Sequence, residues 1–168
     1  ARILALLRKK SYLDQICSHY EMALSSAIMD DLTGLYNRAY FINSLELEIK
    51  RARRQKYAIA LAMMDIDDFK RYNDRLGHLD GDMLLREIAQ VLRLSVREVD
   101  MAVRYGGEEF AFIFPETDRH EAVMAVERVL GMIRKHPYSN GMIPQVKPVT
   151  MSAGIAVFPD DADSVNDL

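Results

Sequence analysis

The chain has 168 residues and a formal net charge of −3, with 49% hydrophobic and 28% charged residues. This balance is typical of a folded globular domain and excludes a disordered or fibrous chain. The negative charge disfavours a nucleic-acid partner, because nucleic-acid binders usually carry a basic surplus. The lone Cys17 cannot form an internal disulfide, and no stretch approaches about 20 apolar residues. We therefore expect a cytoplasmic domain without direct membrane insertion.

Residues 1–29 contain no Pro or Gly and carry apolar residues at heptad spacing, which predicts a helix. Two interpretations remain open: a coiled-coil helix that pairs with a second helix, or an amphipathic helix packed on its own domain. The repeat is already under way at the first residue, so we expect a preceding segment in the full protein. We place the domain boundary here, with a globular domain at 30–168.

After this helix, helical and strand-like patterns alternate, and Asn37 is positioned as an N-cap. In chain order we expect a helix at 38–54, a strand at 57–64, a short helix ending at residue 72, a helix at 83–94, strands at 102–105 and 110–114, a helix at 121–133 and a strand at 149–158. The β-α-α-β-β-α-β order behind an N-terminal helix predicts an α+β fold. This is an α/β sandwich with a central, mostly antiparallel sheet.

Gly106-Gly107 joins two strand-like runs and predicts a hairpin turn, because glycine accepts positive φ. The run at 110–114 that follows places three Phe side chains on one face and Ala111 and Ile113 on the other. Both faces are apolar, so we expect this strand in the centre of the sheet.

Acidic residues follow two of the predicted strands. Asp65 ends a buried apolar run, Asp67 shares its face if the strand continues, and Glu108 and Glu109 come just past the hairpin turn. If the two strands pair, these carboxylates meet at one sheet edge and suit Mg²⁺, whose remaining ligands are water and phosphates. Two such ions stabilise a phosphoryl-type displacement. Each acid alone is better explained as an ordinary turn charge, but three polar residues gather at the same edge: Lys70, Asn73 and Asp82.

Four ordered motifs across residues 30–158 resemble the GGDEF family of diguanylate cyclases. The signature Gly106-Gly107-Glu108-Glu109-Phe110 has the family's GGEEF spelling. The other motifs are residues 31–38, similar to DxLTGLxNR; residues 65–74, similar to DIDxFKxxND; and Gly77-His78 with Gly81-Asp82 and Leu85, similar to GHxxGDxxL. The resemblance implies a sheet like that of polymerase palms and nucleotide cyclases.

The resemblance also implies a reaction. In this family two domains face each other as a homodimer, and an upstream sensory domain controls them. Each domain holds one GTP, and together they form cyclic di-GMP and two pyrophosphates. Two Mg²⁺ ions, with Mn²⁺ as the alternative, would be held by Asp65, the carbonyl of Ile66 and Glu108. Asp65, Glu108 and Glu109 would form the catalytic group, with Glu109 in a supporting role.

Further positions match the family's substrate-binding residues. Lys70 and the backbone N–H groups near Asp68 and Phe69 would bind phosphates at a helix start. Asn73 and Asp82 would read guanine, since a carboxylate accepts from the N–H groups that adenine lacks. The paired glycines, Gly106 and Gly107, would let the nucleotide approach the backbone closely.

Arg97-Glu98-Val99-Asp100 stands where the family carries its RxxD product-inhibition site. The resemblance implies that Arg97 and Asp100, assisted by Arg128, bind cyclic di-GMP as an inhibitor. RxxD is a weak pattern by itself, and the alternative is an ion pair three residues apart at a helix end.

The family pattern continues beyond residue 168 with a basic helix and a closing strand, so we expect a C-terminally truncated domain. An alternative function is a catalytically silent module that binds GTP or cyclic di-GMP and signals through protein contacts. A palm-like nucleic-acid polymerase is disfavoured, because the chain lacks a basic stripe that could track a strand.

Overall fold

The computed structural model describes residues 10, 12–13, 15–16, 19, 26–138, 148–162 and 164. The helix predicted at 1–29 falls largely outside these positions, although those that are described up to residue 28 are helical. Its pairing with a second helix therefore stays a prediction. In the described part of the chain, no helix is both long and apolar enough to cross a bilayer.

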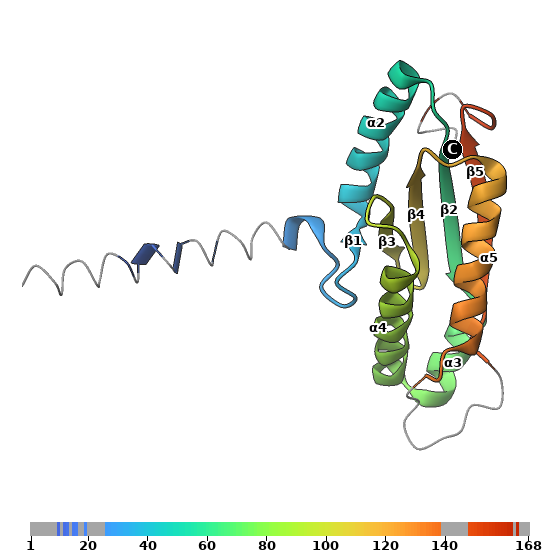
Figure 1. Ribbon diagram of the computed structural model, residues 1–168. Coiled ribbons are helices and arrows are strands. Elements are labelled where there is room, and N and C mark those ends of the chain that lie inside the picture. Colours follow the sequence, from blue (N-terminus) through green and yellow to red (C-terminus); the bar gives the residue numbers. More distant parts are fainter. Residues whose placement is uncertain are drawn as a thin grey trace, which may run out of the picture.

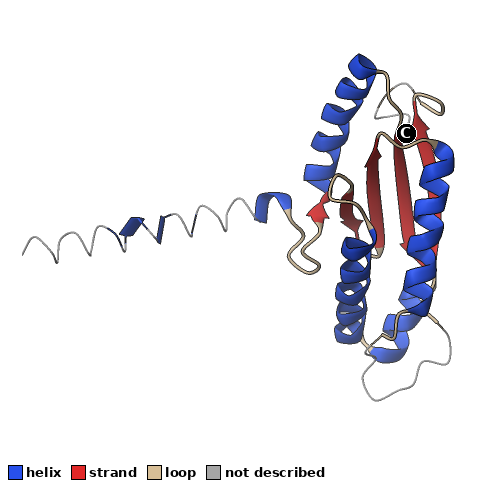
Figure 2. Ribbon diagram, viewed as in Figure 1, coloured by secondary structure: helices blue, strands red, loops and turns tan. Residues whose placement is uncertain are grey.

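Five strands form one sheet in the order β1-β3-β4-β2-β5, with helices on both faces (Figures 1 and 2). The elements are β1 (Tyr36–Asn37), α2 (Arg38–Gln55), β2 (Ile59–Ile66), α3 (Phe69–Leu76), α4 (His78–Ser95), β3 (Met101–Gly106), β4 (Glu109–Pro115), α5 (Arg119–Lys135) and β5 (Met151–Phe158). The β1–β3 pair is parallel and the other pairs are antiparallel. The expected α+β class with a mostly antiparallel sheet is confirmed.

Strand β4 lies third of five and divides the core into two layers. Phe110, Phe112 and Phe114 are buried in a cluster with α4 and α5, whereas Ala111 and Ile113 are buried in a second cluster with α2. The alternation of side chains along β4 therefore assigns one helical layer to each face of the sheet. The prediction of a central strand is confirmed.

The structure corrects several expected boundaries. The two-residue strand β1 was not predicted, because so short a segment carries no periodicity. Strand β2 extends to Ile66, so Asp65 lies inside the strand rather than after it. The helices α3 and α4 are longer than expected and meet at Gly77, which adopts a φ of 95°. The hairpin turn consists of Gly107 and Glu108, and Gly106 is the last residue of β3.

Asn37 caps α2 as predicted. Its side-chain oxygen accepts a hydrogen bond from the backbone N–H of Tyr40 at 2.9 Å. The basic end of that helix contains Arg53 and Arg54 in its last turn, where cations complement the helix dipole. Helix α5 begins with a capping box formed by Asp118 and Glu121.

We expect Phe112→Ala to lower the free energy of unfolding by about 3–5 kcal/mol, because the ring is fully buried and a cavity remains after truncation. The control Leu94→Ala removes a side chain that is 73% exposed and should change stability by less than about 0.5 kcal/mol. Urea denaturation of both variants measures the difference. Equal losses would contradict the assignment of Phe112 to the core.

Candidate active site

The antiparallel register of β2 and β4 places Asp65 directly opposite Glu109. Side chains of directly paired residues leave the sheet on the same face, with Cβ atoms about 4.5–5.5 Å apart. Both residues are exposed, and both continue the alternating positions that face α2. Glu108, the expected metal ligand beside Asp65, lies one residue earlier and is half-buried in the turn.

Two carboxylates opposite each other repel, and a divalent cation would relieve that repulsion. The available donors are hard oxygens from Asp65, Glu108, Glu109 and the carbonyl of Ile66, which suit Mg²⁺. Among the described residues, no three His, Cys, Asp or Glu side chains converge in a geometry that could hold a metal ion.

The turn after β2 is tied to the start of β5. The Asp67 carboxylate accepts hydrogen bonds from the hydroxyls of Thr150 at 2.6 Å and Ser152 at 2.7 Å. These bonds hold the pKa of Asp67 below its usual range. Asp67 was expected to share the face of Asp65 only if the strand continued past it. Strand β2 ends at Ile66, so Asp67 belongs to the turn and this expectation is not met.

Helix α3 begins immediately after this turn. Asp68 adopts a left-handed conformation with a φ of 59° and makes no side-chain cap. The first intrahelical bond runs from the N–H of Tyr72 to the carbonyl of Asp68, so the N–H groups of Phe69 and Lys70 have no intrahelical acceptor. Lys70 is exposed. The helix start therefore offers backbone donors and a cation close to the acidic edge.

Asn73 of α3 and Asp82 of α4 both belong to the region where these two helices meet. The Asn73 side chain packs against Gly81, the residue before Asp82, and both polar residues are half-buried. The Asn73 amide oxygen is buried and has no hydrogen-bond partner among the described residues. Leaving a buried polar atom without a partner costs free energy, so the unpartnered amide oxygen makes this junction a candidate ligand-binding site.

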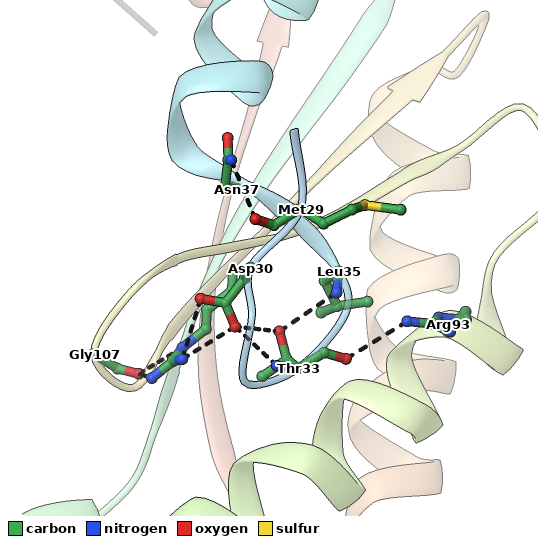
Figure 3. Close-up of polar contacts among 8 residues, drawn as sticks. Met29, Asp30, Thr33, Leu35, Asn37, Arg93 and Gly107 are labelled. Atoms are coloured by element: carbon green, nitrogen blue, oxygen red, sulfur yellow. Dashed lines mark hydrogen bonds and ion pairs between the residues drawn. The ribbon is translucent and has the colours of Figure 1, made fainter. Parts of the chain in front are cut away.

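Arg104 fixes the hairpin that carries both glutamates. Its Nε and Nη2 atoms donate to the Gly107 carbonyl at 3.1 and 2.9 Å. Its Nη1 atom donates to both carboxylate oxygens of Asp30, at 3.1 and 3.2 Å (Figure 3). The side chains of Arg104 and Asp30 are only 15% and 23% exposed, so the ion pair is shielded from solvent. The turn is thereby held to a segment 74 residues earlier in the chain.

The segment around Asp30 is itself braced from several sides. Asp30 accepts from the N–H of Thr33 at 2.9 Å and from its hydroxyl at 2.7 Å (Figure 3). Arg93 of α4 donates to the Gly34 carbonyl. Asn37 donates to the Met29 carbonyl at 3.3 Å, which ties the end of the N-terminal helical segment to the start of α2. The end of that segment is therefore connected to the hairpin through Asp30 and Arg104.

Sequence reasoning missed the roles of Asp30 and Arg104. Both residues stand in or beside the motifs that carry the family resemblance. A charged residue without an assigned role next to each motif was the only hint that the sequence offered. Their separation of 74 residues concealed the pairing.

Arg97, Asp100 and Arg128 form a second polar group at the end of α4. The backbone N–H of Arg97 donates to Asp100 at 2.8 Å, within the turn that follows α4, so the contact is not a helix-end ion pair. Burial raises the pKa of Asp100, although the hydrogen bond from the Arg97 backbone N–H and the charges of Arg97 and Arg128 partly oppose this. The other Asp100 carboxylate oxygen is buried without a partner among the described residues. Arg128 donates to the Ser95 carbonyl at 3.1 Å.

A sheet of this topology with an acidic hairpin is the architecture of GGDEF domains. The chain belongs to that family: residues 27–168 match the profile described as "Diguanylate cyclase, GGDEF domain". It is 35% identical over 164 residues to the response regulator PleD of Caulobacter vibrioides. That alignment covers 98% of this chain and 36% of PleD. It is 38% identical over 161 residues to the diguanylate cyclase DgcP of Pseudomonas aeruginosa, covering 94% of this chain and 24% of DgcP.

Solved structures agree with this assignment. The coiled coil and GGDEF domain of DgcB from Caulobacter crescentus, in complex with c-di-GMP, has a TM-score of 0.78 at 30% identity. The match covers 90% of this chain and 80% of that structure. The chain thus spans most of a solved GGDEF structure but only about a quarter to a third of the length of PleD and DgcP.

We expect Asp30→Asn to lower the free energy of unfolding by about 1–2 kcal/mol at pH 7, because the variant loses the charge that pairs with Arg104. Burial alone would raise the pKa of Asp30, but hydrogen bonds from Thr33 and Arg104 hold it below the ordinary 3.8. The stabilisation is therefore present above pH 3.8 and is lost as pH falls through the folded-state pKa.

Urea denaturation at a series of pH values measures the difference between wild type and Asp30→Asn. Asp31→Asn, at the neighbouring exposed aspartate, is the matched control and should behave as wild type. A destabilisation that is the same size for both variants would contradict the role of the Asp30–Arg104 pair.

Proposed function

We propose that this chain is the catalytic domain of a diguanylate cyclase, which condenses two GTP molecules into cyclic di-GMP and two pyrophosphates. The observation that carries the proposal is the register of β2 and β4, which pairs Asp65 with Glu109 next to the hairpin turn. Such a carboxylate pair is suited to a cation that also binds phosphate. Membership of the GGDEF family, in which cyclases generally use divalent metal ions, supports the same reading.

In the proposed site, Asp65, the carbonyl of Ile66 and Glu108 hold the metal, as two Mg²⁺ ions or alternatively Mn²⁺. When bound, the ions neutralise the phosphate charges that build up as pyrophosphate leaves. Glu109 keeps the edge negative opposite Asp65 and supports metal binding. Asp67 contributes indirectly, because its bonds to Thr150 and Ser152 fix the turn that presents the Ile66 carbonyl.

The nucleotide lies across the junction of α3, α4 and the hairpin. Backbone N–H groups at Phe69 and Lys70, together with the Lys70 ammonium, bind the β- and γ-phosphates at the start of α3. At Gly106 and Gly107 an added Cβ would meet no heavy atom within 4 Å, so their lack of side chains leaves space that a nucleotide can use. The positive φ of 54° at Gly107 gives a second reason for glycine there.

Asn73 and Asp82 recognise the base in this proposal. The Asp82 carboxylate accepts from the N1–H and exocyclic amine of guanine, a donor pair that adenine lacks. The Asn73 amide serves the acceptor edge. Asn73 packs against Gly81, the residue before Asp82, so both groups belong to the junction of α3 and α4.

Each domain holds one GTP, so two domains must face each other, and the 3′-hydroxyl of one GTP attacks the α-phosphate of the other, twice. Catalysis then depends on positioning and charge neutralisation. The helix at 1–29 is proposed to bring two copies together and to connect them to an upstream sensory domain. The use of GTP agrees with a cytoplasmic location.

The group at Arg97, Asp100 and Arg128 is proposed to bind the product as an inhibitor. A guanidinium grips a guanine edge or a phosphate, and a carboxylate accepts from guanine N–H groups. The unpartnered, buried oxygen of Asp100 supports this assignment, because a bound guanine would supply the missing donor.

We expect Glu108→Ala in the full-length protein to lower formation of cyclic di-GMP from GTP and Mg²⁺ on the order of 100-fold or more, because a metal ligand is lost. Chromatography of the products measures the rate. Glu127→Ala removes an exposed carboxylate from α5 and should leave the rate unchanged. A wild-type protein that binds GTP or cyclic di-GMP tightly without any turnover would instead establish the silent signalling module.

We expect Arg97→Ala to raise the concentration of cyclic di-GMP needed for half-inhibition about tenfold or more, without lowering the initial rate, because one guanidinium contact is lost. Arg86→Ala, at an exposed arginine of α4, is the charge-matched control and should keep the wild-type inhibition curve. An Arg97→Ala curve that overlies the wild-type curve would remove this site from the proposal.

A further inference from the structure

Gly81 is the fourth residue of α4 and packs against the Asn73 side chain of α3. A Cβ atom added to Gly81 would lie 1.9 Å from the Asn73 Oδ1 atom, 2.9 Å from its Cγ and 3.3 Å from its Nδ2. The first two distances are shorter than any van der Waals contact allows. The Asn73 amide therefore occupies the space that any other residue at position 81 would fill.

Backbone conformation does not explain the glycine. Gly81 lies within a regular helix and lacks the positive φ seen at Gly34, Gly77 and Gly107. A glycine inside a helix is less favourable than alanine, because it loses more backbone freedom on folding. Gly131 of α5 offers the contrast, since an added Cβ there meets nothing within 4 Å. The need for glycine at 81 is thus steric and arises from one neighbour, Asn73.

The close packing also orients the Asn73 amide. Its oxygen is the atom nearest to Gly81, is buried and accepts no hydrogen bond from the described residues. The amide nitrogen lies further from the added Cβ, at 3.3 Å, and is the donor that the proposed site would offer to the base. The amide oxygen packs against Gly81, so a single added carbon atom at position 81 is enough to move it.

We propose that Gly81 is a positioning residue for nucleotide recognition: its missing side chain lets Asn73 lie against α4 and present its amide to the base. The inference rests on the proposed function, because it concerns the same GTP site. Gly81 touches no substrate and acts through Asn73. The predicted defect is in affinity for the nucleotide, while the metal-binding edge at Asp65 and Glu109 is untouched.

The test compares Gly81→Ala with Gly131→Ala in the full-length protein, assayed with GTP and Mg²⁺. Both variants replace a helical glycine by alanine and share the same intrinsic effect on the helix. We expect Gly81→Ala to raise the KM for GTP on the order of tenfold with little change in kcat, because a base contact is displaced. Gly131→Ala should keep the wild-type KM. A Gly81→Ala enzyme with wild-type KM would overturn the proposal.

A double-mutant cycle shows whether the effect runs through Asn73. Asn73→Ala removes the amide that Gly81 accommodates, so adding Gly81→Ala to it should raise the KM no further. An additional rise of the same size as in the single variant would overturn the proposal, because Gly81 would then act by another route. The double variant contains no clash, so it also serves as a folded reference, and thermal melting of all four proteins checks that each is folded.

Failure of the proposed function has a separate signature. If the wild-type protein makes no cyclic di-GMP, the cyclase assignment fails, but the role of Gly81 is still judged by equilibrium binding of GTP. A tenfold weaker Kd in Gly81→Ala than in Gly131→Ala would then support the inference. Equal Kd values, or no GTP binding by the wild type, would overturn it.

Discussion

The pairing of β2 with β4 is the constraint on which the rest of this structure depends. A shift of one residue in that ladder would move Asp65 to the opposite face of the sheet from Glu109. The register is held by the apolar residues of both strands, which are buried on both faces between α2 on one side and α4 and α5 on the other. Burial of the strand interiors thus offsets the cost of placing two carboxylates opposite each other at the strand ends.

A hairpin that ends in an exposed glycine turn needs support from elsewhere, and Arg104 provides it. The guanidinium joins the Gly107 carbonyl to the Asp30 carboxylate, and Asn37 joins the same region to the end of the N-terminal helical segment. One short turn therefore contacts both the end of the N-terminal helical segment and the hairpin that contains Glu108 and Glu109. Because the Asp30–Arg104 ion pair is shielded from water, its charge-assisted hydrogen bonds hold the hairpin to this turn more strongly than an exposed pair would.

Much of the architecture could be predicted from the sequence. The three Phe residues at alternating positions predicted a central strand, and Asn37 predicted a helix start, because both signals are local. The predicted boundaries were wrong where local signals were weak. The strand β1 has only two residues, and the polar Asp65 concealed the end of β2. The acidic residues of the hairpin edge, Asn73 and the RxxD motif were all predicted as site residues from the sequence. Asp30 was not, because its partner Arg104 is 74 residues away.

The sequence by itself determined the helical and strand periods, the hairpin and the family, because these depend on residues close together in the chain. Only the tertiary structure decided that Glu109 rather than Glu108 faces Asp65, that Arg104 pairs with Asp30, and that Gly81 leaves room for the Asn73 amide. Each of these depends on contacts between separate elements, and the orientation of one element on another is set by how their side chains fill the shared core.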